Sequence, residues 1–208
     1  MLRNIVAAAM LLAFVAPASP ASPSADAALK ELRQTFRVHG KPIPPEVIGD
    51  FGDGDMADSG PIRVTIDLLA AIGSNLYYGD IAVAPNGWVS QKRVVPNGGA
   101  EKQTEEMGYA FDGAARNGLL IVTSTFSGGG TGVFTYLHIL DAAVARAFDD
   151  EGKPYDRLNL TNIRSVSLGD RWKGEIKING DTIAIVTARD QQTDARKPGT
   201  ELIQAARP

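Results

Sequence analysis

The chain has 208 residues, of which 21 are Lys or Arg and 24 are Asp or Glu, and its formal net charge is −3. The basic residues are scattered, so the chain lacks the dense basic patch with which nucleic-acid-binding proteins neutralise phosphates. It contains no cysteine, which excludes disulfides, a lipid-modified N-terminal cysteine and zinc sites of the Cys-His type. Composition therefore predicts no nucleic-acid partner and a fold stabilised by an ordinary apolar core.

The N-terminus has the pattern of a secretory signal peptide. Arg3 gives a short basic start, residues 5–16 form an apolar run, and Ser19-Pro20-Ala21 supplies small residues for cleavage. The apolar run is shorter than the ~20 residues that a membrane-spanning helix needs. We therefore predict a cleaved signal peptide over residues 1–21, export to the periplasm or the medium, and no membrane span in the mature chain.

A short helix is predicted directly after the signal peptide. Ser24 can cap a helix over residues 25–38, on which Leu29, Leu32 and Phe36 recur on one face. A proline-rich linker follows the helix.

Most of the chain beyond the linker predicts β-structure. The pairs Asn86-Gly87, Asn117-Gly118 and Asn179-Gly180 accept the positive φ angles of tight hairpin turns. Strand-like segments and turns recur at a spacing typical of antiparallel sandwiches and barrels. About nine strands are predicted, near residues 62–69, 77–84, 88–95, 105–112, 118–126, 132–140, 158–167, 172–178 and 182–188. We expect a mainly β fold, either a single antiparallel β-sandwich or a barrel-like meander, with a short N-terminal helix.

Two details of this β-structure can be predicted further. A two-residue turn at Asn179-Gly180 would place Ile176 opposite Ile183 on one apolar face. Residues 119–126 and 133–140 are apolar on both faces, which is typical of central strands covered from two sides. Residues 142–148 stay undecided, because their alanines favour a helix while the residues before them favour a strand.

The chain divides into four parts on these observations. Residues 1–21 are the signal peptide, 22–45 the short helix and linker, and 46–188 the β domain. Residues 189–208 are polar and carry Lys197-Pro198-Gly199, so we expect this tail to fray.

Four segments between residues 39 and 186 stand out together. They are Gly40-Lys-Pro-Ile43, Asp58-Ser-Gly-Pro61 with the following Asp67, Ser127-Gly-Gly-Gly-Thr-Gly-Val-Phe134, and Gly169-Asp-Arg-Trp-Lys-Gly-Glu175. Taken together, these segments resemble a family of exported bacterial proteins of unassigned function. The resemblance implies export and a single domain, and it implies no activity and no catalytic or binding role for any residue.

An acidic loop is the one candidate metal site. Asp50, Asp53, Asp55 and Asp58 place several carboxylates close together, and Ca²⁺ takes oxygen ligands of this kind. The spacing does not match an EF-hand, which needs a glycine at its sixth position and a glutamate at its twelfth. A solvated turn is the alternative interpretation, and no other cofactor is predicted.

Two segments are candidate contact surfaces. The first is the glycine loop, Ser127, Gly128, Gly129, Gly130, Thr131 and Gly132, whose bare backbone can approach a ligand closely or can simply connect two strands. It is not a P-loop, because no Lys-Ser or Lys-Thr follows the glycines. The second is Asp170, Arg171 and Trp172, which join a charged fork to an aromatic ring, as binding hot spots do. The alternative for this segment is a capping turn with a structural tryptophan.

No catalytic signature is present. His138 lies in an apolar strand with Phe134 and Tyr136 on its face, which favours a hydrogen-bonded core imidazole over a general base. We therefore predict an exported, non-enzymatic binding module of the cell envelope whose partner is an envelope protein, a small ligand or a glycan. The alternatives are a carbohydrate-active or other hydrolytic enzyme, and a structural protein that assembles through an exposed strand edge.

Overall fold

The computed structural model describes residues 24–51, 63–73, 80–96, 102–189 and 196–207. Within these ranges the chain is mainly β, as predicted, with three short helices. These are α1 (Ala25–Thr35), α2 (Pro45–Gly49) and α3 (Leu68–Gly73). None of them is long and apolar enough to cross a membrane. The predicted signal peptide lies outside the described residues.

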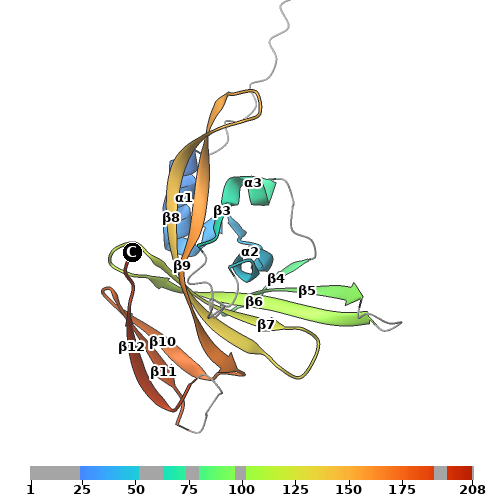
Figure 1. Ribbon diagram of the computed structural model, residues 1–208, viewed down its shortest axis with the longest axis vertical. Coiled ribbons are helices and arrows are strands. Elements are labelled where there is room, and N and C mark those ends of the chain that lie inside the picture. Colours follow the sequence, from blue (N-terminus) through green and yellow to red (C-terminus); the bar gives the residue numbers. More distant parts are fainter. Residues whose placement is uncertain (1–23, 52–62, 74–79, 97–101, 190–195, 208) are drawn as a thin grey trace, which may run out of the picture.

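The main sheet has seven antiparallel strands and does not close into a barrel (Figure 1). Its strands, in spatial order, are β3 (Thr65–Asp67), β9 (Pro154–Asp170), β8 (Phe134–Phe148), β7 (Leu120–Ser127), β6 (Lys102–Ala114), β5 (Val89–Pro96) and β4 (Ile81–Val83). Strands β4 to β8 are each paired with the next strand in sequence, and β3 completes the edge beside β9. Residues 142–148 belong to β8, which decides the ambiguous segment in favour of a strand.

Two smaller sheets accompany the main one. A three-stranded sheet consists of β10 (Gly174–Asn179), β11 (Thr182–Thr187) and β12 (Gly199–Gln204), with β11 in the middle. A two-stranded ribbon, β1 (Arg37–Val38) and β2 (Lys41–Pro42), follows α1.

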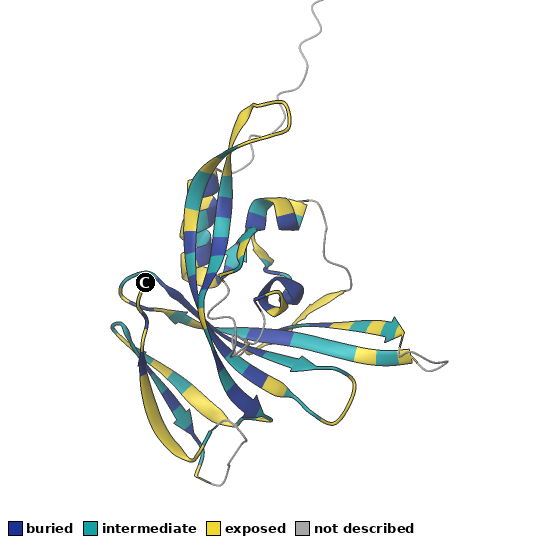
Figure 2. Ribbon diagram, viewed as in Figure 1, coloured by how far each residue is buried: buried dark blue, intermediate teal, exposed yellow. Residues whose placement is uncertain are grey.

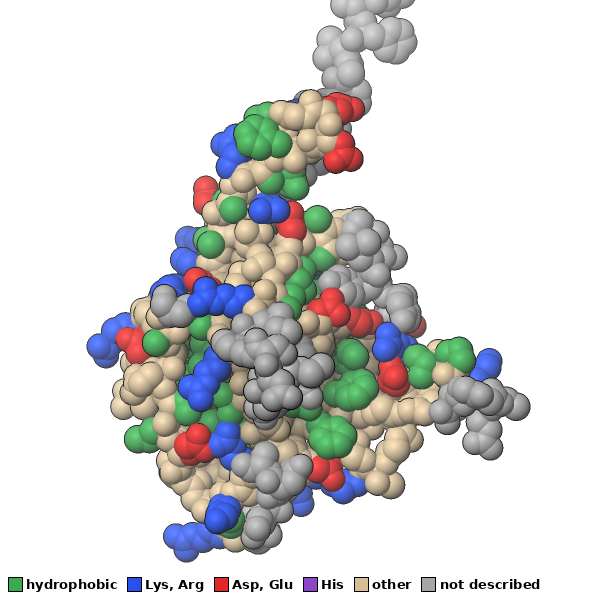
Figure 3. Space-filling model, viewed as in Figure 1, with side chains coloured by type: hydrophobic (Ala, Val, Ile, Leu, Met, Phe, Trp, Pro, Cys, Tyr) green, Lys and Arg blue, Asp and Glu red, His purple; other side chains and the backbone are tan. Residues whose placement is uncertain are grey.

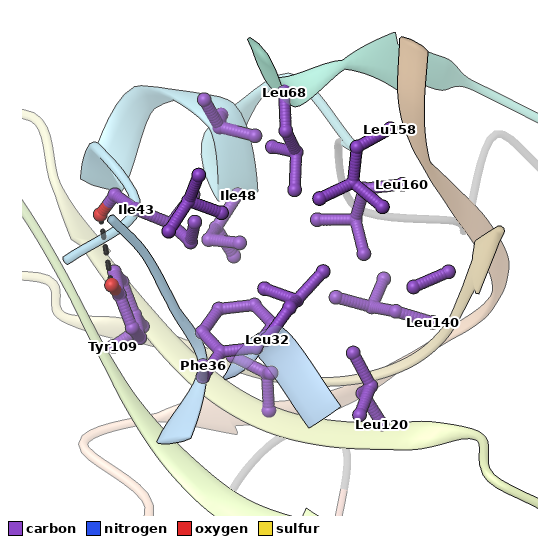
Figure 4. Packing of buried hydrophobic residues seen from close by; sticks show 14 of the residues in the cluster. Leu32, Phe36, Ile43, Ile48, Leu68, Tyr109, Leu120, Leu140, Leu158 and Leu160 are labelled. Carbon is purple, nitrogen blue, oxygen red and sulfur yellow. Dashed lines mark hydrogen bonds between the residues drawn. The ribbon is translucent and has the colours of Figure 1, made fainter. Parts of the chain in front are cut away.

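The main sheet is covered on both faces, and buried residues concentrate where the layers meet (Figure 2). On one face the helices and the ribbon pack over a helix-side core, of which Leu32, Phe36, Ile43, Ile48, Leu68, Tyr109, Leu120, Leu140, Leu158 and Leu160 are labelled in Figure 4. On the other face the three-stranded sheet packs over a sheet-side core made of Ala115, Leu119, Ile121, Leu137, Ile139, Val166, Leu168, Ile183, Ile185, Ile203 and Ala205.

Strands β7 and β8 alternate between these two cores. Leu120 and Leu140 lie in the helix-side core, whereas Ile121 and Ile139 lie in the sheet-side core. The prediction of central strands covered from two sides is therefore confirmed, and its cause is an apolar side chain on each face of the same strand.

Helix α1 begins where the sequence predicts and ends three residues early. The Ser24 side chain accepts a hydrogen bond from the Ala27 amide, and Phe36 closes the helix in a left-handed conformation with φ 52°. Leu32 and Phe36 are fully buried, and Leu29 packs against the same core. The predicted apolar face is therefore the face that docks on the sheet.

The turn predictions are confirmed for two hairpins, and the predicted register of the third is wrong. Gly87 and Gly118 adopt φ near 83° and 84° in the turns before β5 and β7. In the β10–β11 hairpin, Asn179 still pairs with Thr182, so the turn residues are Gly180 and Asp181.

As a result of this shift, Ile178 lies opposite Ile183, and Ile176 lies opposite Ile185. The register differs from the prediction by two residues. Because side chains alternate with a period of two, the same isoleucines still share one face.

Two further segments differ from expectation. Residues 68–73, partly predicted as a strand, form α3, because the Asp67 carboxylate accepts hydrogen bonds from the Leu69 and Ala70 amides and caps the helix. The tail does not fray over residues 199–204, which form β12 and bury Ile203 in the sheet-side core. The two apolar side chains of Ile203 and Ala205, together with pairing to the edge of β11, outweigh the polar composition of the tail.

Candidate functional site

The structure brings the two predicted contact segments together. The glycine loop connects β7 to β8, and Asp170 ends β9 beside it. The Arg171 guanidinium donates to the Thr131 carbonyl and to the Asp170 carboxylate. The Asp170 carboxylate in turn accepts from the Val133 amide at 2.7 Å. We call the glycine loop together with Asp170, Arg171 and Trp172 the loop–turn surface. Its charged groups interact with one another, and its role in binding stays a prediction.

Within the glycine loop, one glycine is required by the fold. Gly129 has φ 83°, and a Cβ atom there would lie 2.8 Å from the Thr104 carbonyl oxygen. At Gly130 a Cβ atom would meet nothing within 4 Å. The loop therefore contains both a structurally necessary glycine and a glycine whose replacement the fold accommodates.

The Trp172 side chain is held by packing and by a hydrogen bond within the fold. Its indole N–H donates to Thr187 Oγ1 at 3.0 Å, and its ring packs against the sheet-side core. The ring also lies over Gly174, where a Cβ atom would come within 2.2 Å of it. These contacts agree with the structural alternative that the sequence left open for this residue.

The acidic loop lies mostly outside the described residues, which include Asp50 and exclude Asp53, Asp55 and Asp58. Asp50 follows α2, where its amide donates to the Glu46 carbonyl. Among the residues that the structure describes, no group of three or more His, Cys, Asp or Glu side chains is placed to hold a metal ion.

A cavity of about 280 Å³ lies between α2 and the middle of the main sheet. Strands β6, β7 and β8 supply most of its wall, and α2 supplies the rest. It is lined by Pro45, Ile48, Gly49, Met107, Gly108, Ser124, Thr125, Phe126, Tyr136 and His138. Figure 3 shows hydrophobic side chains gathered on the surface in this region of β6 and β7. The cavity is predominantly apolar, with a few polar groups, as ligand-binding cavities are.

A chain of hydrogen bonds starts at the wall of this cavity and runs into the sheet. Ser124 Oγ lies 2.8 Å from His138 Nε2, and His138 Nδ1 lies 2.8 Å from Ser165 Oγ. The Asn162 side-chain amide donates to Ser165 Oγ at 3.0 Å. Three neighbouring strands, β7, β8 and β9, position these groups through their register.

His138 is 1% exposed, and burial lowers its pKa to about 4. Burial has this effect because a low-dielectric surrounding disfavours the charged imidazolium. His138 is therefore neutral at pH 7 and hydrogen-bonded on both ring nitrogens, which confirms the predicted core imidazole.

This cavity was not predicted from the sequence. Ser124 and Phe126 share one face of β7, and Tyr136 and His138 share one face of β8, because side chains alternate between the two faces of a strand. The sequence therefore indicates which of these residues lie on the same face. That pattern does not show that α2 covers them.

Comparison with family models, curated proteins and solved structures found no match.

Proposed function

We propose that this protein is a non-enzymatic binding module that takes a small apolar ligand in the cavity beneath α2. The observation that carries the proposal is the cavity itself, with its volume of about 280 Å³ and its mostly apolar lining. This volume is close to the lower end of the range for small-molecule sites, about 300–1,000 Å³. No Lys, Arg, Asp or Glu is among its lining residues in the described part of the chain.

Export to the cell envelope is part of the same proposal. It is supported by the basic start at Arg3, the apolar run over residues 5–16 and the small residues at Ser19-Pro20-Ala21. The resemblance to exported bacterial proteins points to the same compartment.

The loop–turn surface is the proposed site for a second, larger partner, an envelope protein or a glycan. Arg171 and Asp170 remain partly exposed, with 55% and 37% of their side chains accessible. A charged pair at the end of a strand, beside a glycine loop, offers directional hydrogen bonds to a partner.

Ligand binding can be tested with the fluorescent apolar probe N-phenyl-1-naphthylamine and two matched variants. Gly49 is the last residue of α2 and lines the cavity, and a side chain there would point at the Met107 thioether. Gly73 is the last residue of α3, and a Cβ atom there meets nothing within 4 Å. We expect Gly49→Leu to weaken probe binding about tenfold or more, because the leucine fills the cavity.

The control variant Gly73→Leu should bind the probe as the wild type does, since it adds the same side chain at the same place on another helix. Circular dichroism and thermal unfolding would establish that both variants are folded. A wild type that does not enhance probe fluorescence, or equal losses in both variants, would contradict the proposed cavity site.

One observation favours the hydrolytic alternative as a second candidate. Ser124 Oγ and His138 Nε2 are 2.8 Å apart in a cavity, which is the spacing of a serine nucleophile and its general base. A hydrolase would release p-nitrophenol from p-nitrophenyl butyrate, and Ser124→Ala should abolish this release. Ser90→Ala, on β5 and outside the cavity lining, should leave it unchanged. Release that persists in Ser124→Ala would end this candidate.

A further inference from the structure

Ser124 is the polar group through which the cavity can recognise a ligand. The residue is 8% exposed, and it lines the cavity from β7. Its side chain makes one hydrogen bond in the described structure, to His138 Nε2. A hydroxyl can donate one hydrogen bond and accept two. Which of these capacities remains for a ligand depends on where the imidazole proton lies.

The orientation of Asn162 fixes the first step of the hydrogen-bond chain. Its side-chain nitrogen lies 3.4 Å from the Phe51 carbonyl oxygen and 3.0 Å from Ser165 Oγ. A carbonyl oxygen only accepts hydrogen bonds, so the NH₂ group of Asn162 must face it. Ser165 Oγ consequently accepts a proton from Asn162.

The remaining hydrogen of Ser165 then decides the tautomer of His138. If Ser165 donates its hydroxyl proton to His138 Nδ1, every group of Ser165 has a partner. In the opposite tautomer the Ser165 hydroxyl proton would have no acceptor among the described residues, and because Ser165 is only partly buried it would turn to solvent. Only the first arrangement pairs every polar group of Ser165 within the protein. The imidazole proton is therefore assigned to Nε2, from which it is donated to Ser124 Oγ.

This assignment leaves the Ser124 hydroxyl proton directed to the cavity as a hydrogen-bond donor. It also leaves His138 unable to accept the Ser124 proton, because Nε2 already carries one. The same geometry that suggests a catalytic pair thus favours binding over hydrolysis. We propose that the cavity binds an uncharged molecule with an apolar body, which presents an acceptor oxygen, such as the carbonyl of a ketone or an ester, to the Ser124 hydroxyl.

The surroundings explain why the ligand must be uncharged. A carboxylate or an ammonium group in this cavity would lose hydration without meeting an opposite charge among the lining residues.

The test compares three probes of similar size as competitors of N-phenyl-1-naphthylamine. Acetophenone carries an acceptor oxygen, α-methylstyrene has the same shape without it, and benzoate carries a charge. We expect Ser124→Ala to weaken acetophenone about fivefold relative to α-methylstyrene, the usual effect of one neutral hydrogen bond. Dividing the loss of acetophenone affinity by the loss of α-methylstyrene affinity cancels the effect of the substitution on apolar contacts, as in a double-mutant cycle. Wild-type protein should bind benzoate more weakly than acetophenone.

This inference rests on the proposed cavity site, and the experiment separates the two. Equal weakening of acetophenone and α-methylstyrene in Ser124→Ala would overturn the role of the hydroxyl donor. Benzoate binding as tight as that of acetophenone in the wild type would overturn the selectivity for uncharged ligands, even if Ser124→Ala does not fold. In both cases the cavity remains a binding site, whereas failure of the naphthylamine probe to bind contradicts the proposed function itself.

Discussion

Gly174→Ala should destabilise the protein by about 3 kcal/mol, the upper part of the range for overpacking. A Cβ atom at Gly174 would lie 2.2 Å from the Val186 carbonyl oxygen and 2.2 Å from the Trp172 ring. The carbonyl belongs to the β10–β11 ladder and cannot move away without breaking strand pairing. Urea unfolding monitored by tryptophan fluorescence would measure the loss as a lower midpoint.

Gly130→Ala is the matched control for this substitution. It adds the same methyl group in the glycine loop, where nothing lies within 4 Å and no positive φ is required. The free energy of unfolding should change by less than about 0.5 kcal/mol. Similar losses in both variants would show that the close approach at Gly174 does not matter. The expected contrast would establish that the spacing of the Trp172 ring and Gly174 in this turn serves packing.

Acidification should remove a stabilising contribution of His138, whereas Asp112, whose pKa burial raises to about 6, acts in the opposite sense over part of the same range. The pKa of His138 is about 4 in the folded state, compared with an ordinary value near 6.5. Between these two values the unfolded chain binds a proton at this residue that the folded chain excludes, so the contribution of His138 to the free energy of unfolding falls as the pH is lowered. The contribution is fully present above about pH 6.5 and is lost progressively toward pH 4. A shift of this size corresponds to about 3 kcal/mol.

Two glutamine variants isolate this effect, because the chain has only two histidines. His138→Gln keeps a neutral polar side chain near Ser124 and Ser165, and the acid-induced fall in its unfolding free energy between pH 6.5 and 4 should be absent or reversed, because Asp112 still titrates in this range. His39 is exposed, so His39→Gln should retain the wild-type pH dependence. Chemical unfolding at a series of pH values provides the comparison. A wild-type slope in His138→Gln would assign the acid sensitivity to other groups.

The predictable part of this fold is the part that local chemistry determines. Asparagine-glycine pairs place hairpin turns because glycine accepts positive φ, and the two-sided apolar pattern of residues 119–126 places a strand at the centre. The β10–β11 register was wrong by two residues because either register buries the same isoleucines. Pattern alone does not distinguish alternatives that differ by a full period of the strand.

The candidate site was less predictable because its parts are distant in sequence. Ser124, His138 and Ser165 come from three strands, and only the register of those strands brings their side chains into line. The cover over the cavity is the five-residue helix α2, whose Pro45 start resembles a linker in the sequence. The residues of the loop–turn surface could be selected from the sequence by their composition. The hydrogen bond from Arg171 to Thr131 could not, because it depends on the tertiary fold.

The connectivity of the main sheet also implies an order of folding. Strands β4 to β9 form a meander in which each hairpin can close locally. Apart from the short β1–β2 ribbon, the N-terminal elements depend on distant partners: β3 pairs with β9, and the Arg33 guanidinium of α1 donates to the Ala142 carbonyl 109 residues away. Contacts of high sequence separation are the slow ones to form. The first-synthesised third of the chain therefore acquires its core last, after β8 and β9 exist to receive it.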